Sequence, residues 1–63
     1  MNKQDFLDKI KATINYNIDK YSYVKNGENH MFAYELQIRI KTLRELYKDV
    51  HGGANWQDDL LLR

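Results

Sequence analysis

Residues 31–50, MFAYELQIRIKTLRELYKDV, decide between two folds for this chain. Apolar side chains in this segment recur at three and four residues, so they form one continuous face on a helical wheel. The members of this face are Phe32, Leu36, Ile40, Leu43, Leu46, Tyr47 and Val50. Most of the other residues are strong helix formers, and Glu35 with Arg39 is a favourable pair four residues apart. The segment therefore predicts a long amphipathic helix.

The Asn26-Gly27 pair before this segment permits a different fold. Asn-Gly is a favoured type I′ turn between two strands, and residues 32–40 also alternate between apolar and polar side chains. The alternation ends after Ile40, and a strand over residues 29–40 is long beside the usual length of about 5 to 6 residues. The helix is therefore the favoured interpretation, and an α+β fold with a β-hairpin around Asn26-Gly27 is the alternative.

A second amphipathic pattern lies nearer the N-terminus. Its apolar members also recur at three and four residues: Phe6, Leu7, Ile10, Ile14, Ile18 and Tyr21. Asn2 is a preferred helix cap, and Asp5, three residues later, suits the positive end of the helix dipole. The pattern predicts a helix over residues 3–21.

Two residues mark the connection between the predicted helices. Gly27 is expected to adopt the left-handed conformation that ends a helix, and Asn29 is expected to cap the second helix over residues 29–50. Because the connection is short, the two helices are expected to pack side by side as an antiparallel hairpin.

The C-terminal segment begins with glycine and then restarts as a helix. Gly52 follows the second helix and is expected to end it in a left-handed conformation. Asn55 suits the cap of a short helical turn over residues 56–62. The predicted fold is therefore all-α, an antiparallel helical hairpin with a short C-terminal helical turn, and residues 1–63 form a single small domain.

The composition restricts the classes of protein to which the chain belongs. Its 63 residues include no Cys, which excludes a disulfide scaffold and any zinc site built on Cys. A hydrophobic content of 43% with a net charge of +1 is typical of a folded domain and not of a disordered one. No apolar run approaches the length of a membrane span or signal peptide, so we expect a cytoplasmic protein that does not bind membranes.

A second apolar patch on the residue 31–50 helix lacks a partner within the hairpin. Met31, Tyr34 and Ile38 face away from the main apolar face, so the C-terminal tail, a second copy of the chain or another protein must cover them. A chain this short often gains stability from a partner. The predicted protein-binding residues are the apolar groups that a hairpin leaves uncovered, together with Tyr16 on the polar side of the first helix: Met31, Tyr34, Ile38, Trp56, Leu60, Leu61, Leu62 and Tyr16.

A polar and basic stripe lies beside the main apolar face of the second helix. Its members are Gln37, Lys41, Arg44 and Lys48. Such a stripe suits contacts with a phosphate backbone. A net charge close to zero favours an ordinary solvated surface instead, so nucleic-acid binding is the alternative function and protein binding the first.

The residue types used in catalysis form no recognisable pattern in this chain. His30 and His51 are not spaced with carboxylates as metal ligands or acid-base groups are, and no nucleophile elbow, P-loop or Rossmann glycine pattern occurs. A chain this short also has little room for a ligand pocket. We therefore expect no enzymatic activity, no metal or other cofactor and no small-molecule substrate.

The chain combines a short helical hairpin with many Lys, Asn, Asp and Tyr residues and with no Cys or Pro. In these features it resembles the small accessory proteins of bacteriophages and mobile elements. The resemblance implies a non-enzymatic protein-binding module in the host cytoplasm. Such a module acts as a homodimer, or as a stoichiometric inhibitor or adaptor of a host enzyme or defence complex, as anti-CRISPR proteins do.

Residues 2–7 and 39–56 carry a second resemblance. They are similar to the two ends of the haemolysin-expression-modulating family of small, nucleoid-associated helical proteins. The middle of the chain aligns with that family only with a gap, and Gly52-Gly53 departs from its pattern. This similarity implies the nucleic-acid-binding alternative.

Overall fold

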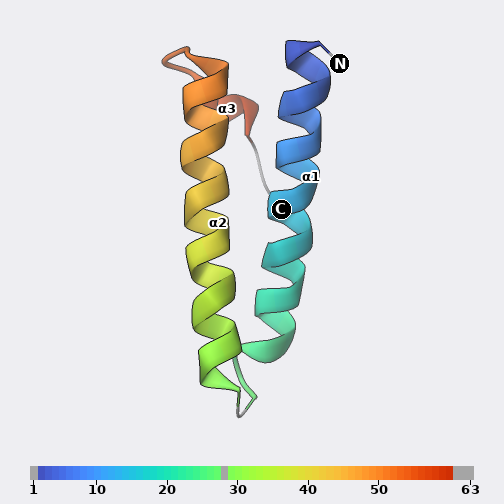
Figure 1. Ribbon diagram of the computed structural model, residues 1–63, viewed down its shortest axis with the longest axis vertical. Helices are drawn as coiled ribbons and strands as arrows, with labels where there is room; N and C mark the ends of the chain where they lie inside the picture. The colour runs from blue at the N-terminus through green and yellow to red at the C-terminus, as the bar shows by residue number, and fades with distance from the viewer. Residues whose placement is uncertain (1, 28, 61–63) are drawn as a thin grey trace.

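The computed structural model describes residues 2–27 and 29–60, which form three helices (Figure 1). α1 (Lys3–Val24) and α2 (His30–His51) are each 22 residues long and run antiparallel as a hairpin. α3 (Trp56–Asp59) is a short turn near the C-terminal end. The described residues include no strand, so the all-α prediction is confirmed and the β-hairpin alternative is wrong.

α1 begins as predicted but ends later than predicted. The Asn2 side chain caps it by accepting a hydrogen bond from the Asp5 N–H at 2.8 Å. The helix continues about one turn past its predicted end to Val24, which lines a shared hollow with Phe32 at the start of α2. Gly27 is not left-handed, so that prediction is wrong; its N–H donates to the Val24 carbonyl at 2.9 Å in a tight turn.

α2 has the predicted ends to within one residue. The Asn29 side chain accepts a hydrogen bond from the Phe32 N–H at 3.0 Å, and Gly52 ends the helix with a φ of 74°. Asn55 does not cap α3 through its side chain, which corrects the prediction. Its side-chain amide donates instead to the Asp59 carboxylate at 3.4 Å.

The core lies between the two long helices and α3. Its buried side chains are Leu7, Ile10, Ile14, Tyr47 and Leu60. Partly buried side chains surround them: Ile18, Ile40, Leu43, Val50 and Trp56. The apolar face of α2 thus continues past Ile40 into the core, which explains why the helix prevails over the short alternating pattern at residues 32–40.

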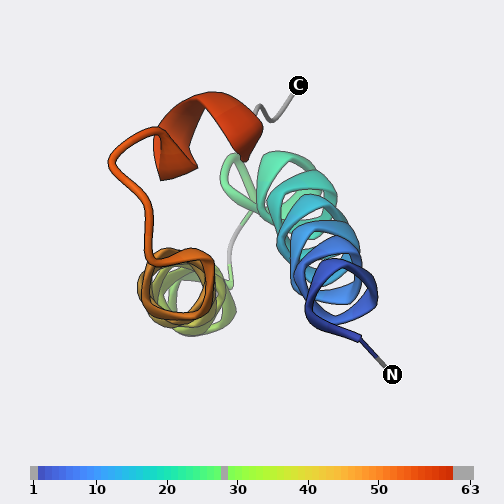
Figure 2. The same ribbon diagram turned by 90° about the horizontal axis from the view of Figure 1, so that it is seen from above.

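α3 folds back onto one face of the hairpin (Figure 2). Leu60, which follows α3, is only 3% exposed, and Trp56 is half-buried against the same core. The sequence predicts both as uncovered contacts; that is wrong for Leu60 and holds only in part for Trp56, because the tail turns into the hairpin. Leu61 and Leu62 lie outside the described residues.

Candidate protein-binding groove

Four of the predicted protein-binding residues have exposed side chains in the structure: Tyr16, Met31, Tyr34 and Ile38. Tyr16 on α1 and Ile38 on α2 line the same hollow between the helices. Met31 and Tyr34 lie outside this hollow, although Met31 is 71% exposed. Ile38 thus shares the hollow with Tyr16, and it lies on the same side of α2 as Met31 and Tyr34.

A groove runs between α1 and α2, with a volume of about 510 Å³. We call it the helix-pair groove, and its lining residues are Thr13, Tyr16, Asn17, Ile38, Arg39, Thr42 and Leu43. A second hollow continues it toward the turn and shares Tyr16 with it; Tyr23, Val24 and Phe32 also line this hollow. The two hollows together extend along much of the hairpin, so they could contact a long segment of a partner.

The helix-pair groove and α3 lie on opposite faces of the hairpin. Lys11 faces α3, because its ammonium group donates to the Asp59 carbonyl at 3.2 Å. Thr13, which lines the groove, is two residues further along α1 and so lies about 160° away around the helix axis. α3 and Leu60 therefore fill one side of the hairpin and leave the other side open.

Two contacts stabilise the α1 wall of the groove. The Lys20 ammonium lies over the Tyr16 ring at 4.9 Å from its centroid, which is a cation–π distance. Asn17 is buried at the floor of the groove, and its amide donates to the Thr13 carbonyl at 2.7 Å. The floor thus presents no unsatisfied polar group to an incoming apolar side chain.

Exposed apolar side chains beyond those predicted also lie along the hairpin. Phe6, Tyr23 and Leu46 are all exposed. Phe6 and Leu46 belong to the apolar patterns of the two helices, and their spacing predicts them in the core. They lie instead at the edge of each helical face, where a hairpin of only two helices provides no cover.

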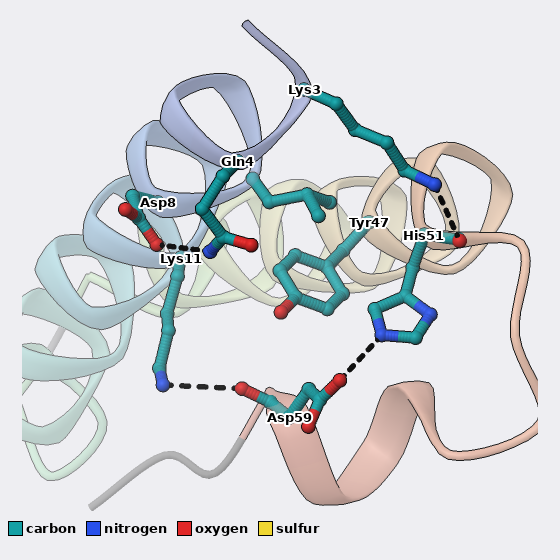
Figure 3. Close-up of a pocket in the computed structure, with 8 residues that line it drawn as sticks. Lys3, Gln4, Asp8, Lys11, Tyr47, His51 and Asp59 are labelled. Carbon is teal, nitrogen blue, oxygen red and sulfur yellow. Dashed lines mark hydrogen bonds and ion pairs between the residues drawn. The ribbon is translucent and has the colours of Figure 1, made fainter.

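Another hollow, the α3-side pocket, contains a close pair formed by a histidine and a carboxylate (Figure 3). Its lining residues are Lys3, Gln4, Leu7, Asp8, Lys11, Tyr47, His51 and Asp59. His51 Nε2 lies 2.6 Å from an Asp59 carboxylate oxygen, and His51 Nδ1 accepts a hydrogen bond from the Gly53 N–H at 3.1 Å. These contacts fit a neutral imidazole that donates through Nε2. Sequence spacing did not predict this pair.

The contacts of the α3-side pocket attach the C-terminal segment to both long helices. Lys3 Nζ donates to the His51 carbonyl at 3.0 Å, and Lys11 joins α1 to Asp59. The Tyr47 ring stacks on the His51 ring with centroids 5.9 Å apart. Since the polar groups of this pocket bind one another, we assign it the structural role of holding α3 in place (Figure 3).

Because of Tyr47, we expect the fold around the α3-side pocket to lose stability at alkaline pH. Burial raises the pKa of its hydroxyl above the usual value, and the carboxylates of Asp59 and Asp8 raise the pKa further. The unfolded chain therefore ionises Tyr47 first as pH rises. Its contribution is fully present below pH about 10 and is lost as pH rises through the folded-state pKa, at up to about 1.4 kcal/mol per pH unit.

Urea unfolding of the wild type and of Tyr47→Phe between pH 8 and 11 measures this effect. We expect the free energy of unfolding to fall more steeply with pH in the wild type than in Tyr47→Phe. The comparison removes the shared titration of the lysines. Parallel pH profiles would show that the Tyr47 hydroxyl is not buried as described.

The predicted basic stripe is present on the α3 side of the hairpin. Gln37, Lys41 and Arg44 line one hollow with Trp56, and the Lys48 ammonium lies 5.9 Å from the centroid of the Trp56 ring. The Gln37 amide also donates to the Tyr21 hydroxyl at 2.7 Å. Part of the stripe is thus used in contacts within the chain.

Searches for metal clusters, membrane spans and known relatives give no indication of function. Within residues 2–27 and 29–60, no cluster of three or more His, Asp or Glu side chains is placed to hold a metal ion. Neither long helix has a stretch apolar enough to cross a membrane in this described part. No protein-family model, no curated protein and no solved structure matches the chain. A functional proposal therefore rests on the residues of this chain.

Proposed function

We propose that this chain is a non-enzymatic protein-binding module that holds another polypeptide in the helix-pair groove. The observation that carries the proposal is the open, mainly apolar groove on the face opposite α3, with Tyr16 and Ile38 exposed on its two walls. Exposed apolar surface of this kind favours association, because its burial lowers the free energy by about 25 cal/mol per Å².

The shape of the groove favours a helical partner. Two long antiparallel helices present ridges and grooves into which a third helix packs, as in helical bundles. Tyr and Ile side chains at the centre of such a face are suitable anchors, since aromatic and large aliphatic groups contribute much of the energy of protein interfaces. The partner is either a second copy of the chain or a different protein. A host enzyme or defence complex is suggested by the resemblance to phage accessory proteins.

Nucleic-acid binding has less support from the structure. Lys41 and Arg44 lie beside the acidic Glu45 in one hollow, and Lys48 contacts the Trp56 ring. Charges of both signs on this face weaken the attraction to phosphates. The face also carries α3, whereas the open groove lies on the opposite side.

A pair of matched substitutions tests the proposal. Ile38→Asp places a charge in the groove, whereas Tyr34→Asp places the same charge at an exposed apolar residue of α2 outside the groove. We expect Ile38→Asp to weaken association by at least about tenfold and Tyr34→Asp to leave it nearly unchanged. Light scattering measures self-association, and affinity capture from cells of the source organism with mass spectrometry measures binding to other proteins.

Circular dichroism of both variants establishes that the helices remain folded. Equal effects of the two substitutions would contradict the groove as the binding site. A wild-type chain that neither self-associates nor retains any protein would contradict protein binding itself.

A further inference from the structure

We propose that a second copy of this chain occupies the helix-pair groove. The two copies are related by a two-fold axis parallel to the long helices, so that α1 of each copy packs against α2 of the other in a four-helix bundle. This inference rests on the proposed function, because it uses the same groove, and it adds the identity and orientation of the partner.

The two helices carry parallel stripes of side chains along the edges of the groove. Residues three or four apart share one face of a helix. The α1 stripe consists of Lys9, Thr13, Tyr16, Lys20 and Tyr23. The α2 stripe consists of Met31, Glu35, Ile38, Thr42, Leu46 and Asp49. Each stripe has a mainly uncharged centre and two charged residues.

The charges on the two stripes have opposite signs. The α1 stripe carries Lys9 and Lys20, and the α2 stripe carries Glu35 and Asp49. These four side chains are exposed, and no ion pair joins them to one another within the described part of the chain. The α1 stripe is therefore basic and the α2 stripe acidic, while Arg39 of α2 and Asp19 of α1 also line the hollows beside them.

The charged residues also occur at matching heights along the hairpin. Lys3 contacts the His51 carbonyl near one end, and Tyr21 contacts Gln37 nearer the other. Interpolation between these contacts places Lys20 level with Ile38, so that Glu35 lies within about one turn of Lys20 and Asp49 within about one turn of Lys9. When the groove face of one copy packs against the groove face of a second copy at the same height, opposite charges on the two stripes are therefore brought close together.

Only one of the two face-to-face arrangements achieves this pairing. An axis parallel to the helices sets the α1 stripe of one copy against the α2 stripe of the other at the same height, so Lys20 approaches Glu35 and Lys9 approaches Asp49, twice each by symmetry. An axis perpendicular to the helices sets the two basic stripes against each other and the two acidic stripes against each other. Like charges in that position select against the second arrangement.

The size of the face is adequate for a dimer of moderate affinity. The molecule measures 39 Å along the hairpin and 20 Å across, and a typical specific interface buries about 800 Å² per partner. Since α3 lies on the opposite face, it does not obstruct the approach. The polar residues Thr13, Arg39 and Thr42 in the groove predict a reversible dimer and not an obligate one.

Charge reversal tests the proposal by sedimentation equilibrium. Lys20→Glu alone sets two carboxylates against each other on both edges of the dimer, and Glu35→Lys alone sets two ammonium groups against each other there. We expect each variant to raise the dimer dissociation constant by about tenfold. An equimolar mixture of the two variants allows a mixed dimer in which each edge joins one carboxylate to one ammonium group, so we expect the mixture to dimerise more tightly than either variant alone.

The double variant Lys20→Glu with Glu35→Lys restores opposite charges on both edges of its own dimer. We therefore expect this double variant to dimerise within about threefold of the wild-type dissociation constant. A double variant that dimerises as weakly as the single variants would overturn the pairing of Lys20 with Glu35.

Lys41→Glu is the matched control, because it changes the net charge by the same amount in the hollow beside α3. We expect it to leave the dissociation constant within about twofold of the wild type. A loss equal to that of Lys20→Glu would show that net charge, and not the pairing of the stripes, governs association.

A distance measurement tests the orientation. The chain has no Cys, so Asn26→Cys in the exposed turn provides a single site for a spin label. The proposed axis places both turns at the same end of the bundle, which predicts a short distance between labels. A distance approaching the 39 Å length of the molecule would overturn the proposed arrangement in favour of the perpendicular axis.

The outcomes separate this inference from the proposed function. A wild-type chain that remains monomeric up to millimolar concentration would overturn the homodimer, while loss of a captured protein on Ile38→Asp would still support the groove as a protein-binding site. A dimer that is unaffected by Ile38→Asp would contradict both proposals.

Discussion

Replacing Leu36 with Ala is expected to lower the free energy of unfolding by about 3 kcal/mol. Leu36 is fully buried, with 0% of its surface exposed, and lies on the core face of α2. Truncation removes the transfer free energy of the side chain and leaves a cavity that neighbours fill only in part. A domain of 63 residues has a total stability of roughly 3–9 kcal/mol, so this single change removes a third of it or more.

Thermal and urea unfolding followed by circular dichroism measure this loss. Leu46→Ala is the matched control, because Leu46 lies on the same helix but is 40% exposed. We expect the control to lose less than about 1 kcal/mol. Equal losses of stability for the two variants would contradict the orientation of α2, which buries Leu36 and exposes Leu46.

The ends of the helices could largely be predicted from the sequence, because they depend on local chemistry. Asn2 and Asn29 cap their helices through hydrogen bonds to N–H groups three residues later, and Gly52 takes the left-handed conformation for which glycine is favoured. The alternation around Ile38 misleads only when it is considered apart from the apolar face that continues to Val50. Long periodic patterns outweigh short ones in such a choice.

The direction of the C-terminal tail could not be predicted from local patterns. Leu60 packs into the core with side chains of α1, and His51 pairs with Asp59, through contacts between segments that are separate in the sequence. The tail packs on one face of the hairpin, and the opposite face therefore stays open. Tyr16 and Ile38 could be identified as exposed, but their common groove appears only when the helices are placed side by side.

Leu60 connects the tail to the core, and a charge at this position should release α3. Leu60 is 3% exposed and belongs to the same cluster as Leu7, Ile10 and Tyr47. An Asp in its place has no positive partner in this cluster, so it must either stay buried without compensation or move into water. Movement into water removes Leu60 and the half-buried Trp56 from the core together.

Leu60→Asp is therefore expected to lower the free energy of unfolding by about 3 kcal/mol and to move the fluorescence of Trp56, the only Trp, to longer wavelength. Gln57→Asp adds the same charge at an exposed residue of α3 and should change neither quantity appreciably. Because the long helices keep their own contacts, helical circular dichroism at low temperature should fall little in Leu60→Asp. An unchanged Trp56 emission in a folded Leu60→Asp variant would show that Leu60 does not hold α3 against the hairpin. A complete loss of helix would show instead that α1 and α2 depend on the tail to remain paired.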